Sequence, residues 1–419
     1  MALSDWNIVT HSMWSRRFST ALTVMSVAIA CGLVTLLISM RSAGENSFKR
    51  GTGNVQMLIS KEPGPLPSVL NSMFYAQAPG NPILWSQYQE LIDAYPFAWS
   101  VPTLLGDSYR DAPVMGTTTA FFVDFQPVAG QHWQLERGRL FDKPFEAVLA
   151  SDAAARLGLD LGDSLVLHHG SPGSPGGHDH DEFSVEVVGV LRPTATAHDR
   201  AIYTSLETSW VLHAHDRRER TLGHGVETTI DDLIDEDRKV TAVYASLGVR
   251  RAALVQVLSA LRRDPSWTVA NPADSVGGLF RIVSNIDQVL LAMAIAVMLS
   301  SGVSILVALY NSMDQRRRQI AVLRVLGATR TRVFNLVLTE SAMIGLLGSV
   351  LGVVLALLGG RLVASILAAR VGIVIEPALP IDGYLLIILS TIALSCIAGI
   401  IPSIVAYRTS VVRSLKPIG

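Results

Sequence analysis

The sequence has little charge and little cysteine. Only 16% of its 419 residues are charged, 49% are hydrophobic, and the formal net charge is −1. This composition differs from that of a soluble protein of similar length, and it provides no overall basic field for a nucleic acid partner. The two cysteines, Cys31 and Cys396, both lie inside apolar runs. We therefore expect no disulfide framework, and any domain outside the membrane must rely on its own core.

Motifs for nucleotide binding and catalysis are also missing. The chain has five lysines, and none of them follows a glycine as in the phosphate-binding motif G-x-x-x-x-G-K-[ST]. It contains no G-x-S-x-G elbow, no H-E-x-x-H pair and no paired-cysteine site. A solvated loop explains the acidic run at residues 231–237. We predict that the chain is not an enzyme and binds no cofactor directly, apart from the metal considered below.

Four apolar runs are present, each long enough for a membrane span of about 20 residues. The first, at residues 19–40, is too long for the apolar core of a signal peptide and lacks a small-x-small cleavage site. We therefore expect it to be retained. Between the first two runs the composition becomes that of a globular domain. The predicted fold class is a membrane protein with four transmembrane α-helices and a large α+β extracytoplasmic domain between helices 1 and 2.

Positive charge sets the expected orientation of these segments. Arginines and lysines flank alternate ends of the runs, whereas the loop at 361–382 has only two, so both termini are predicted to be cytoplasmic. The predicted order is a cytoplasmic interfacial helix at 1–18, spans at 19–40, 282–310, 333–360 and 383–407, an extracytoplasmic domain with stalk extensions at 41–281, a basic cytoplasmic helix at 311–332, a short outer loop at 361–382 and a cytoplasmic tail at 408–419.

Local patterns within the extracytoplasmic domain predict both strands and helices. Short runs rich in β-branched and aromatic residues favour strands, and apolar residues at helical spacing favour helices. The expected strands lie at 120–125, 147–150, 164–168, 183–191 and 239–247, and the expected helices at 151–158 and 250–262.

The stretch between the second and third spans is the most basic part of the chain. Six arginines surround a short apolar stripe of Ile320, Leu323, Val325 and Leu326. Gly327 provides a helix stop, and Thr329 provides a cap for the next helix. Two interpretations follow from the residues alone. The stretch is either a topology-setting loop with a solvated basic face or a docking helix for a cytoplasmic partner.

Several motifs resemble those of the MacB/FtsX-like (type VII) permeases of ABC transport systems. RRRQIAVLRVLGATRTRVFNLVLTES resembles the arginine-rich segment and following span of that family, GLLGSVLG its glycine-rich third span, and IPSIVAYRTSVVRSLKP its terminal signature. In the outer domain, GQHWQLERGRLFDKPFEAVLASDAAARLGLDLGDSLVL and FSVEVVGVLRPTATAHDRAIYTSL resemble the MacB-like periplasmic core domain. Two polar inserts, at about 169–182 and 213–237, and the proline-rich segment after the first span depart from the pattern.

The resemblance implies a homodimer in the bacterial inner membrane, in contact with lipid, that works with a dimer of a separate ABC ATPase carrying ATP and Mg²⁺. A periplasmic substrate-binding or adaptor protein stays open as a further partner. ATP hydrolysis would drive a periplasmic conformational change, called mechanotransmission, that moves a lipoprotein, lipid, peptide or drug-like substrate. The residues assigned to ATPase coupling are Arg316, Arg317, Arg318, Ile320, Leu323, Arg324, Leu326 and Gly327.

Histidines and carboxylates gather in the two polar inserts. Imidazole and carboxylate side chains are ligands for Zn²⁺ and similar ions, but no spacing here fixes a tetrahedral set. A zinc site and a solvated hairpin tip therefore both stay open. The candidate metal ligands are His168, His169, His178, Asp179, His180, Asp181, His213, His215 and His224.

Two further features lie in the third span. Glu340 is an ionisable residue about two turns into the membrane, and we expect it to face a helix interface, with Arg330 or Arg332 as a partner. Gly345, Gly348 and Gly352 have the spacing that permits close helix contact, either within one subunit or between two.

Three functions are compatible with the sequence. The first is a mechanical permease subunit of an ABC transport system. The second is a transmembrane signalling regulator of the FtsX type, in which motion activates a periplasmic partner and nothing crosses the membrane. The third is a zinc-linked ABC system that uses the histidine-rich inserts.

Overall fold

The computed structural model describes residues 5–170, 177–223, 225–249, 251–325, 327–371 and 377–408. The chain forms two compact units. One, here called the helical unit, comprises Met1–Gly44, Val283–Ile366 and Ile375–Gly419. The other, the α+β domain, comprises Glu45–Ile282 and Leu367–Val374. This organisation confirms the predicted fold class.

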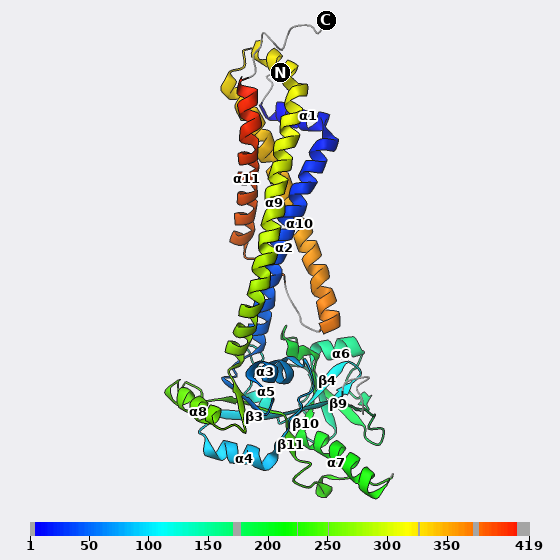
Figure 1. Cartoon of the computed structure of the whole chain (residues 1–419). Coiled ribbons are helices and arrows are strands. Elements are labelled where there is room, and N and C mark those ends of the chain that lie inside the picture. Colours follow the sequence, from blue (N-terminus) through cyan, green and yellow to red (C-terminus); the bar gives the residue numbers. More distant parts are fainter. Residues whose placement is uncertain are drawn as a thin grey trace. The chain divides into compact units, whose positions relative to one another are not determined.

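Four long apolar helices meet the length and composition needed for membrane spans. They are α2 (Arg17–Gly51), α9 (Pro272–Val325), α10 (Arg330–Val371) and α11 (Ile381–Arg408), and a short α1 (Asp5–Ser15) precedes them (Figure 1). Helix α2 continues past residue 40 to Gly51, and α9 begins at Pro272, before residue 282, as expected of stalks; α9 also continues past residue 310 to Val325. Helix α10 continues to Val371, past residue 360, because apolar residues without a breaker follow its paired glycines.

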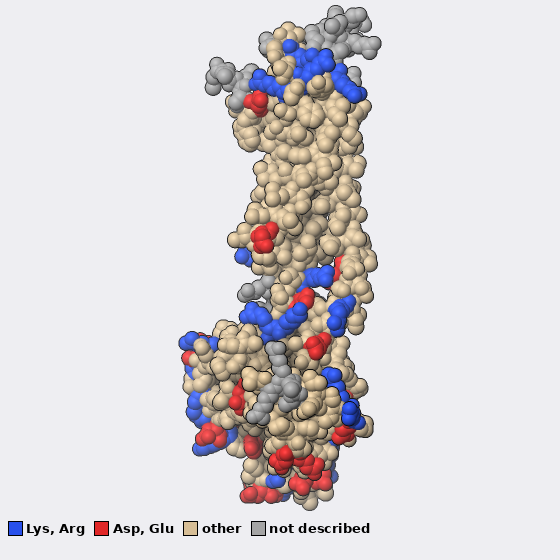
Figure 2. Space-filling view, turned by 90° about the vertical axis from the view of Figure 1, so that its left-hand side faces the viewer, with Lys and Arg blue, Asp and Glu red and all other residues tan. Residues whose placement is uncertain are grey.

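Charge is sparse on one face of the helical unit. On the face that Figure 2 shows, few charged side chains lie along the helices, and basic residues gather at one end. The described basic residues of the helical unit near the predicted cytoplasmic ends of the spans include Arg16, Arg17, Arg324, Arg330 and Arg408. A surface of this kind is expected of helices surrounded by hydrocarbon, and the chain is a multi-pass membrane protein.

Glycines allow α10 to approach two neighbouring helices. A Cβ atom added at Gly348 would lie 2.6 Å from Val27 of α2, and one added at Gly352 would lie 2.6 Å from the carbonyl oxygen of Ala28. A Cβ atom at Gly345 would lie 2.5 Å from Ser395 Oγ on α11. The glycine spacing therefore serves packing within one chain.

Helix α1 packs against the spans through a few apolar residues. Val9 and Met13 are buried in a cluster with Val27, Ile305 and Ile344, while Trp6 and Trp14 remain exposed. Exposed tryptophans beside buried aliphatic residues suit a helix lying at headgroup depth.

The α+β domain is built on an 11-stranded sheet in the described residues. Its main strand order is β13-β1-β12-β3-β4-β10-β6-β9-β5, with β7 on β9 and β8 on β3; β2 and β11 form a separate pair. The bounds are β1 Met57–Ser60, β2 Ile83–Leu84, β3 Trp99–Tyr109, β4 Ala112–Thr117, β5 Leu135–Gly138, β6 Glu146–Leu149, β7 Ser164–Leu165, β8 His168–His169, β9 Val185–Leu191, β10 Ile202–Ser205, β11 Lys239–Val240, β12 Ala242–Ser246 and β13 Thr268–Ala270.

Helices cover both faces of this sheet (Figure 1). Successive side chains of β1 point to opposite faces of the sheet. Leu58 accordingly belongs to one core cluster, and Met57 and Ile59 belong to another. The first cluster includes residues of α3 and α5, the second includes residues of α4, α7 and α8, and a third includes α6. The bounds are α3 Pro65–Phe74, α4 Trp85–Ala94, α5 Ala120–Val123, α6 Ser151–Leu157, α7 Leu206–Leu222 and α8 Arg251–Arg263, with 3₁₀ turns at Ala197–Arg200 and Ile230–Asp232.

Most of the expected elements of this domain are present. The predicted helices correspond to α6, which ends at Gly158 with φ +67°, and to α8. The strand predicted at 120–125 is wrong, since this segment begins with helix α5. Phe121, Phe122 and Phe125 are all buried in one cluster, and a short apolar run does not distinguish a buried helical turn from a strand.

The glycines shared with the family motifs have a structural role. Gly138 of β5 pairs with Gly189 of β9, and φ is +74° at Gly138. A Cβ atom at Gly138 would lie 2.2 Å from the carbonyl oxygen of Val188, and one at Gly189 would lie 2.1 Å from that of Arg139. Only glycine permits this close approach of the two strands.

Candidate functional site

The arginine-rich stretch is the end of α9 and not a separate helix. The span and the stretch form one helix that stops at Val325, and Gly327 follows with φ +97°. Ala328 donates its N–H to the carbonyl oxygen of Leu323 at 3.0 Å, and Thr329 Oγ1 accepts from the N–H of Arg332 at 3.2 Å. The helix stop at Gly327 and the threonine cap are therefore confirmed.

An apolar contact fixes this end of α9 to the following helices. Ile320 is 6% exposed and joins a cluster with Val333 and Val337 of α10 and Ala406 of α11. Leu323 is half-buried, while Val322 and Val325 are exposed. Leu326 lies outside the described residues, as do the side chains of Arg316, Arg317 and Arg318. The surface that the structure describes here thus combines exposed valines with Arg324.

The arginines that begin α10 have partners of their own. Arg332 pairs with Asp5 of α1 at 2.6 Å, and Arg330 lies 5.9 Å from the ring centroid of Tyr407. Glu340 is buried, with 4% exposure. Its expected pairing with Arg330 or Arg332 stays a prediction.

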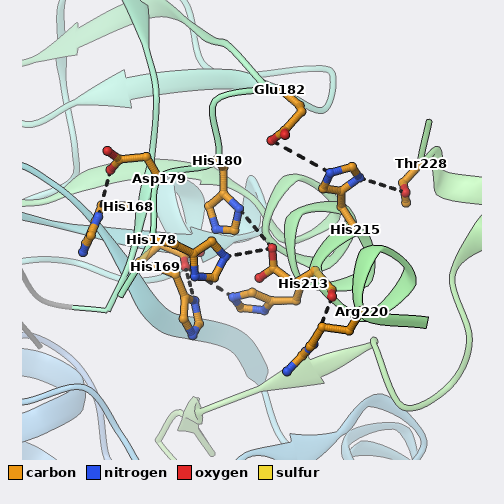
Figure 3. A network of polar contacts seen from close by, with 12 residues as sticks. His168, His169, His178, Asp179, His180, Glu182, His213, His215, Arg220 and Thr228 are labelled. Carbon is orange, nitrogen blue, oxygen red and sulfur yellow. Dashed lines mark hydrogen bonds and ion pairs between the residues drawn. The ribbon is translucent and has the colours of Figure 1, made fainter. Parts of the chain in front are cut away.

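The two histidine-rich inserts come together on one side of the α+β domain (Figure 3). His169 belongs to β8, which pairs with β3, and its register partner is Asp107. His178 and His180 follow on the segment before β9. His213 lies on α7, so most of the second insert's histidines are held on a helix and not on a loop. The folded chain therefore collects four imidazoles from three separate segments.

Asp107 lies between two of these rings. Its side chain is 3% exposed, and Oδ1 is 3.1 Å from His169 Nδ1 and 3.3 Å from His213 Nε2. Burial disfavours the charged carboxylate, but the charge on His213 and hydrogen bonds from both histidines outweigh it and hold the pKa of Asp107 well below its usual range. Burial lowers the pKa of His213, yet the charge of Asp107 outweighs that effect and raises it. Asp107 is therefore ionised at neutral pH.

Asp216 lies between the other two rings. Its Oδ1 is 2.9 Å from His178 Nε2 and 3.5 Å from His180 Nδ1. Burial opposes ionisation of this carboxyl, and hydrogen bonds from His180 and His178 lower its pKa to about 2. The second carboxylate of the cluster is thus also negatively charged near neutral pH.

His180 lies close to both carboxylate groups of the cluster, that of Asp107 and that of Asp216. Its side chain is 1% exposed, and Nε2 has no hydrogen-bond partner among the described residues. Ligand atoms of Asp107, His169 and His180 lie within 4.8 Å of one another, as do those of His178, His180 and Asp216. Both sets of three have the atom types of a Zn²⁺ site.

The other predicted ligands lie apart from these sets. His168 Nδ1 is 2.8 Å from Asp179 Oδ1, and His215 Nε2 is 3.9 Å from Glu182 Oε2. His215 forms a third possible ligand set with Glu182 and Glu219. Asp181 is exposed, and His224 lies outside the described residues.

Two residues of the cluster were missed at the sequence level. Asp216 follows His213 by three positions, which places both on one side of a helix. The polar composition of this segment predicts an insert and not the helix α7, so the pair is not evident from the sequence. Asp107 lies within a strand and is 106 positions from His213, so no local pattern connects them.

His198 differs from the clustered histidines, because its ring packs against Phe125 and Trp133 in the aromatic core. Its Nε2 donates to the carbonyl oxygen of Gly51 at 2.9 Å, and Nδ1 accepts from the Tyr75 hydroxyl at 3.1 Å. Burial lowers the pKa of His198 to about 4, and the hydrogen bond to Gly51 opposes that shift in part. His198 is therefore a neutral structural residue.

Known proteins resemble this chain over most of its length. The model of the MacB-like periplasmic core domain matches residues 20–261, and that of the FtsX-like permease C-terminal matches residues 291–411. An uncharacterized ABC transporter permease protein of Mycobacterium tuberculosis is 27% identical over 226 residues, which cover 52% of this chain and 22% of that protein. The match thus spans less than a quarter of the relative.

The extracellular domain of the noncanonic ABC-type transporter YknZ from Gram-positive bacteria aligns with a TM-score of 0.26 and 10% identity, over 46% of this chain and 96% of that domain. That likeness is too low to support an argument about the fold. The two family models, of which the first covers more than half of the residues, show that the chain belongs to the MacB/FtsX-like family of ABC transporter permeases.

Proposed function

We propose that the chain is the permease subunit of an ABC transport system and converts ATP hydrolysis by a separate ATPase into motion of its α+β domain. One observation carries the proposal. Helix α9 runs without interruption from Pro272, in the α+β domain, to Val325, in the arginine-rich stretch. A displacement at its basic end would therefore pass along a single hydrogen-bonded helix. The moved substrate would be a lipoprotein, lipid, peptide or drug-like molecule.

The end of α9 has the features of a docking surface for the ATPase. The exposed side chains of Val322 and Val325 accompany Arg324, and Ile320 anchors the segment to α10 and α11. The buried centres of interfaces are more apolar than their rims and are enriched in arginine. In the proposed arrangement this surface faces the cytoplasm of a bacterium, both termini lie on the same side, and two copies of the chain bind two copies of the ATPase.

Charge reversal tests the docking role. Arg317→Glu, Arg318→Glu and Arg324→Glu together should abolish co-purification with the partner ABC ATPase and should remove stimulation of its ATP hydrolysis in nanodiscs. Arg262→Glu with Arg263→Glu on α8 is the matched control, because it reverses exposed charges of the α+β domain. Orientation must be measured in parallel, since arginines also set topology. Unchanged association in correctly oriented protein would refute the proposal.

A second candidate function is a metal-linked ABC system. The observation that favours it is the histidine cluster around Asp107 and Asp216, which the α+β domain assembles from three segments.

A further inference from the structure

We propose that the α+β domain binds one Zn²⁺-class divalent cation through His169, His178, His180 and Asp216. Asp107 and His213 would support the site from outside the ligand set. The proposal does not depend on ATPase docking, because it concerns only residues within the α+β domain.

The distances around Asp216 match those of a metal site. In a tetrahedral Zn²⁺ site with bonds of about 2.0–2.1 Å, neighbouring ligand atoms are about 3.3 Å apart. Asp216 Oδ1 lies 2.9 Å from His178 Nε2 and 3.5 Å from His180 Nδ1. Two of the three ligand-to-ligand distances are therefore close to the tetrahedral value, and all three ligand atoms lie within 4.8 Å of one another.

The spacing of the rings points to His169 as the fourth ligand, because its ring lies near those of both His178 and His180. Two imidazoles on one tetrahedral Zn²⁺ have ring centroids about 5 Å apart, given the same bond lengths. The centroids of His178 and His180 are 5.0 Å apart, and that of His169 lies 5.5 Å from His178 and 6.1 Å from His180. A small movement of His169 would complete the set. Three nitrogens and one oxygen favour Zn²⁺ or a similar borderline ion over Mg²⁺ or Ca²⁺, which prefer oxygen.

The residues around the ligands have the arrangement that orients metal-bound histidines. Such rings usually give their second nitrogen to a carboxylate, and buried Asp107 accepts from His169 Nδ1. His213 contacts the same carboxylate oxygen from α7. Asp107 thus fixes the ring of His169 with Nε2 available for another contact.

A network of hydrogen bonds without a metal accounts for only part of the cluster. It explains why the two carboxylates lie between the rings. It leaves His180 with only a long contact of 3.5 Å from Nδ1 to Asp216 Oδ1, and a cation bound at Nδ1 would replace that contact with a bond. The other nitrogen, Nε2, is buried with no partner in the described part of the chain. His180 belongs to both possible ligand sets around Asp107 and Asp216. Removing its ring should therefore weaken cation binding in either arrangement.

Calorimetry on the full-length protein tests the site. The protein is purified in detergent without a histidine tag, stripped with a chelator and titrated with ZnCl₂. We expect one ion per chain with a dissociation constant of about 1 μM or below. His180→Ala and Asp216→Asn should each weaken binding by at least 100-fold. Asp107→Asn should weaken it by about 10-fold, which is typical of a residue supporting a ligand.

Two histidine controls and one spectrum make the result decisive. His132→Ala, an exposed residue of the same domain, and His168→Ala, which pairs with Asp179, should leave zinc affinity unchanged. Co²⁺ added to the stripped wild-type protein should give the intense visible absorption of a tetrahedral site, which does not depend on whether a variant folds. Absence of zinc binding to the wild type, unchanged affinity in folded His180→Ala, or an octahedral Co²⁺ spectrum would overturn the proposal.

Discussion

The helical unit and the α+β domain satisfy their buried polar groups in different ways. In the helical unit, Thr35, Thr391 and Ser403 each donate to the carbonyl oxygen four residues earlier in the same helix. In the α+β domain, Tyr244 donates to Ser72 and His198 to Gly51, which are 172 and 147 positions away. These buried polar side chains of the helical unit are therefore satisfied within single helices, whereas those of the α+β domain connect distant segments.

This difference indicates which substitutions each unit tolerates. Helices whose polar groups are satisfied locally pack against one another through complementary shapes. Their stability should therefore be most sensitive to substitution of the glycines at helix contacts. A domain held by long-range hydrogen bonds is sensitive where a polar side chain is removed, because its distant partner is left unpaired.

The largest effect is expected for Gly352→Val in the helical unit. The new Cβ would lie 2.6 Å from a backbone oxygen of α2, at Ala28, and 2.9 Å from Cys31 Cβ, and backbone cannot move aside as a flexible side chain does. We expect a loss of about 3 kcal/mol or more in the free energy of unfolding, measured in detergent by SDS titration and by the monodisperse fraction on gel filtration.

The matched control for this variant is Gly359→Val on the same helix. A Cβ atom there meets nothing within 4 Å, so the change should stay near 0.5 kcal/mol. Equal destabilisation by the two substitutions would show that close glycine contact with α2 does not hold the helical unit together.

The next effect concerns His198 in the α+β domain and depends on pH. The folded pKa is about 4, below the usual value of 6.5, so the neutral ring contributes stability above pH 6.5 that is lost as the pH falls toward 4. The shift corresponds to roughly 3 kcal/mol. His198→Gln, which can still donate to Gly51 but does not titrate, should flatten the pH dependence of the urea midpoint over this range.

The comparison between wild type and His198→Gln removes the contribution of the other histidines, which both proteins share. Tryptophan fluorescence is a suitable probe, since the Trp133 ring lies 6.3 Å from that of His198. If both proteins lose the same stability between pH 6.5 and 4, His198 is not the buried neutral group that its contacts indicate.

The same contrast explains what could be predicted from the sequence. The spans, the stop at Gly327, the cap at Thr329 and the end of α6 at Gly158 are encoded by neighbouring residues, and all were predicted. The cluster of Asp107 and Asp216 depends on the pairing of β8 with β3 and on the position of α7. Neither is visible in a local pattern, so the histidines could be identified but not their arrangement.

The smallest effect is expected for Asp5→Asn, which removes the carboxylate that pairs with Arg332. The two side chains are 57% and 46% exposed, so water screens the ion pair, and such pairs contribute about 0–1 kcal/mol. Helix α1 should stay in place, because Val9 and Met13 provide its buried contacts. Val9→Asp is the contrasting variant, and it should detach α1 and expose the nearby backbone to limited proteolysis. A loss above 2 kcal/mol in Asp5→Asn would mean that a long-range polar contact holds the helical unit as well, and the distinction between the two units would fail.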